Sequence, residues 1–110
     1  AVGHDVLMAH DGPGALAAIR GFTPDVAVLD IGLPVMDGYE LAARIRERMG
    51  SSAPAFLGMT GYGQLPDLAR SRAAGFEQHF VKPADPAAVL AAVERLGAAQ
   101  AASQERAQRS

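Results

Sequence analysis

Three polar residues, Asp30, Thr60 and Lys82, each follow a short and largely apolar segment of the chain. A carboxylate is a nucleophile toward an activated phosphoryl group. A lysine ammonium offers positive charge to an anionic oxygen, and a threonine hydroxyl can donate a hydrogen bond to another oxygen. Each residue alone has an ordinary structural explanation. If the fold brings them together, the three predict a site that forms and holds an aspartyl phosphate.

Short apolar segments and segments of helical period alternate along the chain, so the elements that position these residues can be predicted. We expect strands over residues 5–9, 25–30, 53–59 and 77–81. We expect helices that begin after Asp11, Asp37 and Asp85 as N-caps and at Pro66. The alternation predicts an α/β fold, a doubly wound parallel sheet in which the strand carboxyl ends share one edge. That edge would carry Asp30, Thr60 and Lys82.

The end of the chain continues the last helical segment. Residues 1–97 fit a single domain, and Val89, Leu90, Val93 and Leu96 are expected to point inward from the last helix. Residues 98–110 are polar and alanine-rich. They either extend this helix or form a frayed tail.

The composition excludes several classes of function. The 110 residues carry a formal net charge of -2, which argues against nucleic acid as the main partner. The chain has no cysteine, so thiolate chemistry and disulfides are excluded. No apolar run approaches the roughly 20 residues of a membrane helix. We therefore expect a cytoplasmic protein without a membrane segment.

Three motifs resemble those of response regulator receiver domains in two-component signalling, which have a flavodoxin-like fold. Residues 30–38 (DIGLPVMDG) resemble the phosphoacceptor signature, with proline four residues after the aspartate. Residues 59–62 (MTGY) resemble the family's Thr-Ala turn, with Gly61 in place of alanine, and residues 80–83 (FVKP) resemble its Lys-Pro motif. The resemblance covers residues 3–97. Residues 76–86 are most similar to receivers of hybrid sensor histidine kinases.

The resemblance implies a role for each motif residue. Asp30 would take a phosphoryl group from the phosphohistidine of a kinase or phosphotransfer domain, and Thr60 and Lys82 would bind the phosphoryl oxygens. Asp30 and the backbone carbonyl of Gly32 would be ligands of Mg²⁺. His79 occupies the place of an aromatic residue that moves together with the threonine.

A family member would signal through the corresponding helix and strand, here residues 65–75 and 77–81. The chain would act as a signalling domain rather than as an enzyme.

The family's opening strand, which ends in two acidic residues, has no counterpart here, because residues 1–4 correspond to the end of its first helix. Without the acidic pair, Mg²⁺ should bind weakly. The family's strand order, 2-1-3-4-5, would leave a gap between the strands of residues 5–9 and 25–30, and Leu90 and Val93 would be exposed. We favour a sequence that is part of a longer one. The alternatives are a partner that closes the gap, by homodimer formation or strand swapping, and direct pairing of the two strands in a degenerate receiver.

Two other functions remain open. A degenerate receiver would bind partners without phosphorylation. A phosphatase of the haloacid dehalogenase type also uses Asp, Thr and Lys at strand ends, but it needs a second acid two residues after the nucleophile. That position is Gly32 here, which disfavours the phosphatase.

Overall fold

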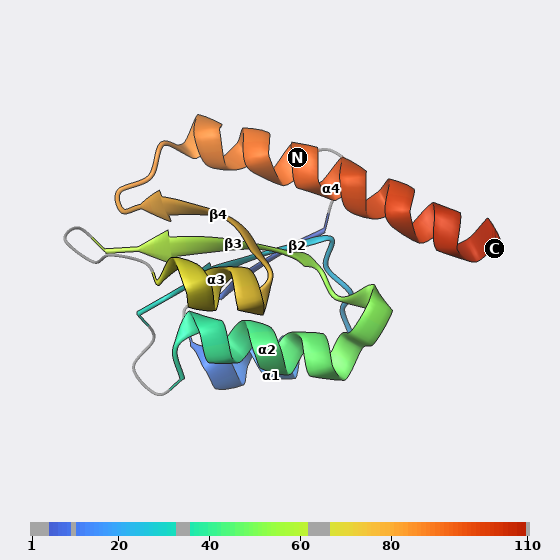
Figure 1. The fold of residues 1–110 in the computed structure, drawn as a ribbon, viewed down its shortest axis with the longest axis horizontal. Coiled ribbons are helices and arrows are strands. Elements are labelled where there is room, and N and C mark those ends of the chain that lie inside the picture. The colour runs from blue at the N-terminus through green and yellow to red at the C-terminus, as the bar shows by residue number, and fades with distance from the viewer. Residues whose placement is uncertain (1–4, 10, 33–35, 62–66, 110) are drawn as a thin grey trace.

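The computed structural model describes residues 5–9, 11–32, 36–61 and 67–109. Strands and helices alternate, as the sequence predicts (Figure 1). The strands are β1 (Val6–Ala9), β2 (Val26–Asp30), β3 (Ala55–Thr60) and β4 (Phe76–Val81). The helices are α1 (Gly12–Ala18), α2 (Gly38–Met49), α3 (Leu68–Ala74) and α4 (Pro86–Arg109), with a short 3₁₀ helix over Gly50–Ser52.

The helix starts follow from short polar side chains that cap them. Asp11 accepts a hydrogen bond from the Gly14 backbone N–H, and Asp37 accepts one from Glu40. Asp67 caps α3 in the same way. The predicted first residue of that helix, Pro66, lies outside the described residues.

The four strands form one parallel sheet in the order β1-β2-β3-β4. The gap expected from the family's strand order is not found between these strands. Direct pairing, one of the three alternatives, is observed instead: β1 pairs with β2 in register from Val6↔Val26 to Ala9↔Leu29. The ladder continues beyond β1, where the N–H of Asp25 donates to the carbonyl of Asp5 at 2.8 Å. The backbone groups that the family's order would have left unpaired are thus satisfied by the adjacent strand.

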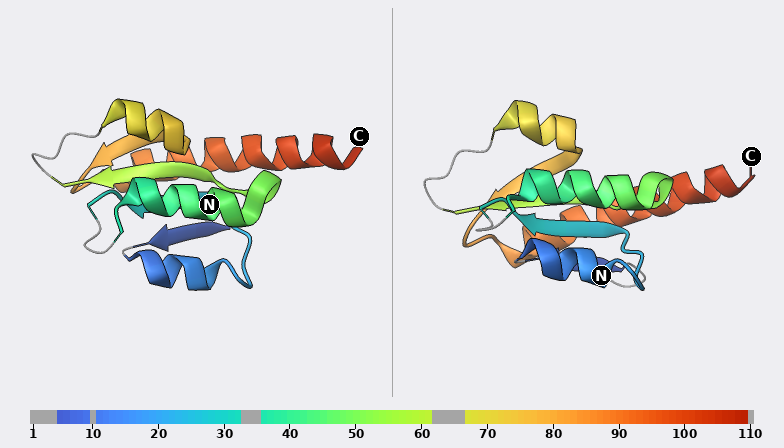
Figure 2. Two further views of the ribbon diagram at one scale, coloured as in Figure 1. Left: turned by 60° about the horizontal axis from the view of Figure 1, so that its bottom comes forward. Right: turned by 90° about the horizontal axis from the view of Figure 1, so that it is seen from below.

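The order of the strands explains which face each helix covers. Successive strands are neighbours in the sheet, and every crossover moves across it in the same direction. Because such crossovers are right-handed, α1, α2 and α3 all lie on one face. Of the helices that the structure describes, α4, which follows β4, alone lies on the other face (Figures 1 and 2).

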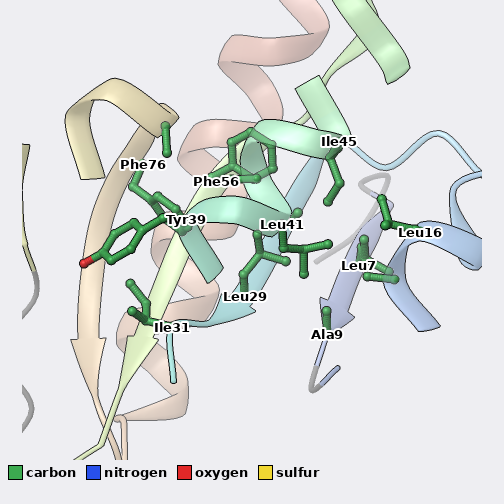
Figure 3. Close-up of a cluster of buried hydrophobic side chains, with 14 residues drawn as sticks. Leu7, Ala9, Leu16, Leu29, Ile31, Tyr39, Leu41, Ile45, Phe56 and Phe76 are labelled. Atoms are coloured by element: carbon green, nitrogen blue, oxygen red, sulfur yellow. The ribbon is translucent and has the colours of Figure 1, made fainter. Parts of the chain in front are cut away.

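The larger core lies beneath α1, α2 and α3 (Figure 3). Leu29, Leu41 and Ile45 are fully buried there, and Phe56 is almost so. The second core lies beneath α4 and contains Val26, Val28, Leu57, Ala92, Val93 and Leu96. The parallel sheet is thus buried on both faces at β2 and β3, which accounts for their nearly continuous apolar sequences.

A single helix does not cover the whole second face. Between α4 and β1 lies an apolar groove, whose lining includes Val6, Met8 and Leu90. Met8 is 56% exposed and Leu90 is 44% exposed. Leu90 is thus exposed, as the comparison with the family predicts, and does not take the inward position predicted from helical period. Val93 is buried against the sheet, which confirms the inward position predicted from helical period and shows that its expected exposure is wrong.

Candidate functional site

Asp30 lies at the carboxyl end of β2 and is held on two sides. The ammonium of Lys82 forms an ion pair with its Oδ2, and the backbone N–H of Gly32 donates to its Oδ1 at 3.0 Å. The Asp30 side chain is 18% exposed and that of Lys82 is 43% exposed. Asp30 is thus oriented but still accessible from one side.

Hydrogen bonds beyond the strand ends hold this edge together. The N–H of Ile31 donates to the carbonyl of Met59 at 2.9 Å, and the N–H of Lys82 donates to the carbonyl of Thr60 at 2.8 Å. These two bonds continue the β2–β3 and β3–β4 pairings by one residue. The structure therefore brings Asp30, Thr60 and Lys82 to one edge of the sheet.

The Thr60 hydroxyl is directed toward β4 rather than toward the carboxylate. Thr60 is 1% exposed, and its Oγ1 donates to the carbonyl of Phe80 at 3.4 Å. At this length the hydrogen bond is weak, so little energy opposes a rotation of the hydroxyl. Thr60 lies at the strand end, but the proton of its hydroxyl is directed to the Phe80 carbonyl rather than to Asp30.

A cavity of about 200 Å³ opens beside the ion pair. Its walls are mostly apolar, and they are formed by Met8, Ala9, Val28, Asp30, Met59 and Lys82. Asp30 and Lys82 supply its charged groups. An anion entering here would meet a lysine ammonium in surroundings of reduced dielectric constant, where the attraction is stronger than in water.

The described residues do not fit a magnesium site. Mg²⁺ prefers several oxygen ligands in octahedral geometry. No group of three or more His, Asp or Glu side chains in the described part of the chain could hold a metal ion. Asp30 is already engaged by Lys82, and Gly32 contributes its N–H to Asp30.

His79 lies on β4, half-buried, with its ring against Phe76. Its Nε2 is 2.9 Å from the Oγ of Ser71 on α3. Burial lowers the pKa of His79 below its ordinary value of 6.5. Ser71 has no signal in the sequence that marks it as a partner of this histidine.

A second group of residues missed by the sequence reasoning ties α2 to α3. The Arg70 guanidinium lies 4.7 Å from the centre of the Tyr39 ring and donates to Asp37 Oδ2 at 3.1 Å. The Tyr39 hydroxyl accepts a hydrogen bond from the N–H of Asp67 at 2.8 Å. The start of α3 is thereby fixed to the start of α2, which follows the loop after Asp30.

Comparison with known proteins gives the family. The model of the response regulator receiver domain matches residues 2–94. The chain is 32% identical to protein PilG of Pseudomonas aeruginosa over 93 residues, 84% of this chain and 69% of PilG. It is 36% identical over 89 residues to the virulence sensor protein BvgS of Bordetella pertussis, a match that covers 74% of this chain and 7% of BvgS.

A solved structure supports the same assignment. The response regulator receiver domain protein (CheY-like) of Methanospirillum hungatei superimposes with a TM-score of 0.70 at 27% identity, over 82% of this chain and 70% of that one. The chain therefore belongs to the response regulator receiver domain family, a family of signalling domains with a flavodoxin-like fold. Within the described residues we find no helix with the length and hydropathy needed to span a membrane.

Proposed function

We propose that this receiver domain accepts a phosphoryl group on Asp30 and signals through a change in the surface formed by α3 and β4. The observation that carries the proposal is the ion pair between Asp30 and Lys82 beside an open cavity. It supports the proposal because a partly exposed carboxylate, a group that can act as a nucleophile, lies beside an ammonium, a group that can bind an anion.

In the proposed reaction, one oxygen of the Asp30 carboxylate attacks the phosphorus atom of a phosphohistidine. The new O–P bond forms as the P–N bond breaks, and the electron pair of that bond remains on the leaving imidazole. The Lys82 ammonium then lies beside a phosphoryl oxygen instead of the free carboxylate. Its charge opposes the negative charge that accumulates during transfer.

The proposed signal starts at Thr60. Rotation of its hydroxyl away from the Phe80 carbonyl would let it donate to a phosphoryl oxygen on Asp30. The space left beside β4 then permits His79 to change rotamer, which alters the packing of α3. Phosphorylation thus acts as a local change of charge with an effect on a neighbouring surface.

The phosphodonor would be a histidine kinase or a phosphotransfer domain in the cytoplasm. The family and the match to BvgS, a sensor protein, support this class of partner. The match covers only 7% of BvgS. In one form of the proposal, this receiver domain is therefore part of a larger sensor protein.

The test is the intact mass of the protein after incubation with acetyl phosphate, with and without Mg²⁺, using Asp30→Asn as the control. We expect a gain of about 80 Da that is absent from the variant. No gain under either condition, together with transfer failing from a phosphorylated histidine kinase domain, would refute Asp30 as the phosphoacceptor.

The second candidate function is a receiver that binds its partner without phosphorylation. The absence of a metal-binding acidic cluster among the described residues favours it. It predicts that partner binding, measured by calorimetry, is the same for the unmodified protein and for Asp30→Asn. A phosphorylation-dependent receiver would bind differently after treatment with the phosphodonor, and only where Asp30 is present.

A further inference from the structure

An irregularity in β4 places His79 on the same face of the sheet as Phe76. Phe56 pairs with Phe76, but the next residue, Leu57, pairs with Gln78, so Glu77 is an extra residue on β4. Side chains three residues apart on a regular strand point to opposite faces. The extra residue reverses this relation. The His79 and Phe76 rings consequently stack, with centroids 5.4 Å apart and planes at 26°.

The imidazole of His79 lies over a glycine on the neighbouring strand. Gly58 pairs with His79 across β3 and β4. A Cβ atom at position 58 would lie only 2.5 Å from His79 Cδ2 and 3.0 Å from its Nε2. The ring therefore fills space that any side chain at position 58 would occupy.

The polar side of the ring faces a buried hydroxyl. Ser71, on α3, is 3% exposed, and its Oγ lies 2.9 Å from His79 Nε2. In the tautomer that carries its proton on Nδ1, the neutral imidazole accepts a hydrogen bond from the Ser71 hydroxyl at Nε2, and the latch requires this tautomer. A protonated imidazole only donates, so Ser71 would have to reverse its hydroxyl while the new charge stays in a half-buried position.

We infer that His79 is a pH-dependent latch between β4 and α3, which holds the helix when the imidazole is neutral and releases it when the imidazole is protonated. The latch depends on the packing of one ring and one hydroxyl. It does not require phosphorylation of Asp30, so it stands or falls separately from the proposed function.

Charged groups on the surrounding elements do not offset protonation of this ring. The ionisable residues on these elements are Asp30 at the end of β2, Asp37 before α2, Tyr39, Glu40, Arg44, Arg46, Glu47 and Arg48 of α2, Asp67, Arg70 and Arg72 of α3 and its N-cap, Glu77 of β4, and Lys82 after it; β3 has none. Glu40 pairs with Arg44, and Arg46 donates to the carbonyl of Ala73. Asp37 pairs with Arg70 and Asp30 pairs with Lys82. Glu77 and Arg72 are exposed. Within the described residues, no carboxylate forms an ion pair with His79.

The direction in which pH changes the stability of the latched state follows from the lowered pKa of His79. Burial lowers the pKa of His79 in the folded protein, while the unfolded chain keeps a value near 6.5. Between the two values the unfolded chain binds more protons. The latched state is therefore fully stable above about pH 6.5, loses stability as the pH falls toward the folded-state pKa, and loses no more below it.

The test is an NMR titration of the whole chain from pH 8 to pH 5 that follows the His79 imidazole and the backbone amides of α3. We expect His79 to titrate below pH 6.5 and the α3 amides to shift with the same midpoint. Taking the imidazole of the released state to titrate near 6.5, as in the unfolded chain, we expect the ratio of released to latched protein below that midpoint to exceed its value at pH 8 by about tenfold for each unit by which the pKa of latched His79 lies under 6.5.

Two variants serve as controls. His79→Gln has no titrating group here, so the α3 amides should lose this midpoint. Gly58→Ala displaces the ring, so His79 should titrate near its ordinary pKa with little coupling to α3. The inference is overturned if wild-type His79 titrates at or above pH 6.5, if α3 does not respond at its midpoint, or if the same response persists in His79→Gln. The first two outcomes need no variant to fold.

Discussion

Asp30 and Lys82, 52 positions apart in the sequence, form an ion pair at the carboxyl edge of the sheet. Two strands that are not adjacent deliver these residues, since β3 lies between β2 and β4. The ion pair therefore requires that β2, β3 and β4 all be assembled in the observed order. It also fixes where an incoming phosphoryl group would meet positive charge.

The ammonium of Lys82 is expected to contribute to phosphoryl transfer. Lys82→Ala should lower the rate of phosphorylation by acetyl phosphate by about 10²-fold, because one preorganised group that stabilises developing charge is lost. Time courses of intact mass measure the rate. Arg95→Ala is the control, because Arg95 is an exposed cation that bonds Gln78 away from the site. An equal loss in both variants would mean that general charge, rather than the position of Lys82, sets the rate.

Magnesium should bind weakly. Among the described residues that line the site, Asp30 supplies the carboxylate, and it is already paired with Lys82, so we expect a Kd no tighter than about 1 mM. An NMR titration with MgCl₂, compared with Asp30→Asn and with a KCl titration at matched ionic strength, measures this. Micromolar binding that depends on Asp30 would show that further ligands join the site.

Gly38 should not tolerate a side chain. A Cβ at this position would lie 2.9 Å from the carbonyl oxygen of Asp30 and 2.9 Å from the Cα of Ile31, both backbone atoms that cannot move aside easily. We expect Gly38→Ala to lower the free energy of unfolding by about 1–3 kcal/mol in urea denaturation. Gly21→Ala is the matched control, because its Cβ would contact nothing within 4 Å. It should change stability by less than about 0.5 kcal/mol. Equal effects would contradict the close approach at Gly38.

Asp37 has two roles that two substitutions can separate. It caps α2 through the N–H of Glu40 at 2.9 Å, and it pairs with Arg70, whose side chain is 54% exposed. Asp37→Ala should cost about 1–2 kcal/mol, since both roles are lost. Asp37→Asn keeps a capping oxygen and should cost less than about 1 kcal/mol, because exposed ion pairs contribute little. Thermal and urea unfolding of the two variants measure the difference. If Asp37→Asn lowers the free energy of unfolding as much as Asp37→Ala does, the ion pair rather than the cap makes the main contribution.

Much of the fold could be predicted because local signals agree with the final structure. The apolar segments ending at Asp30 and Val81 became strands that end at those residues, and β3 ends at Thr60, one residue beyond the prediction. Asp11 and Asp37 cap helices as predicted. Parallel strands end at one edge, so the convergence of Asp30, Thr60 and Lys82 followed from these local signals.

The features that were missed depend on contacts between distant residues. The pairing of β1 with β2 was one of three alternatives that the sequence left open, because local signals do not decide which strands become neighbours, and the strand order of the family predicts another arrangement. The direction of the Thr60 hydroxyl depends on the Phe80 carbonyl, a backbone group. The contact of His79 with Ser71 requires the irregularity at Glu77, and nothing in residues 76–81 alone reveals an extra residue in the pairing.

The sequential order of the strands has a consequence for how the chain folds. Each strand pairs with the next one along the chain, so Val6 meets Val26 and Phe56 meets Phe76 across loops of about twenty residues. Closing short loops costs less chain entropy than joining distant segments, and topologies dominated by local pairings fold faster. With another strand between β1 and β2, at least one pairing would join segments farther apart in the sequence, at a higher cost in chain entropy. In the arrangement seen here, the sheet can grow by adding one strand and one crossover helix at a time.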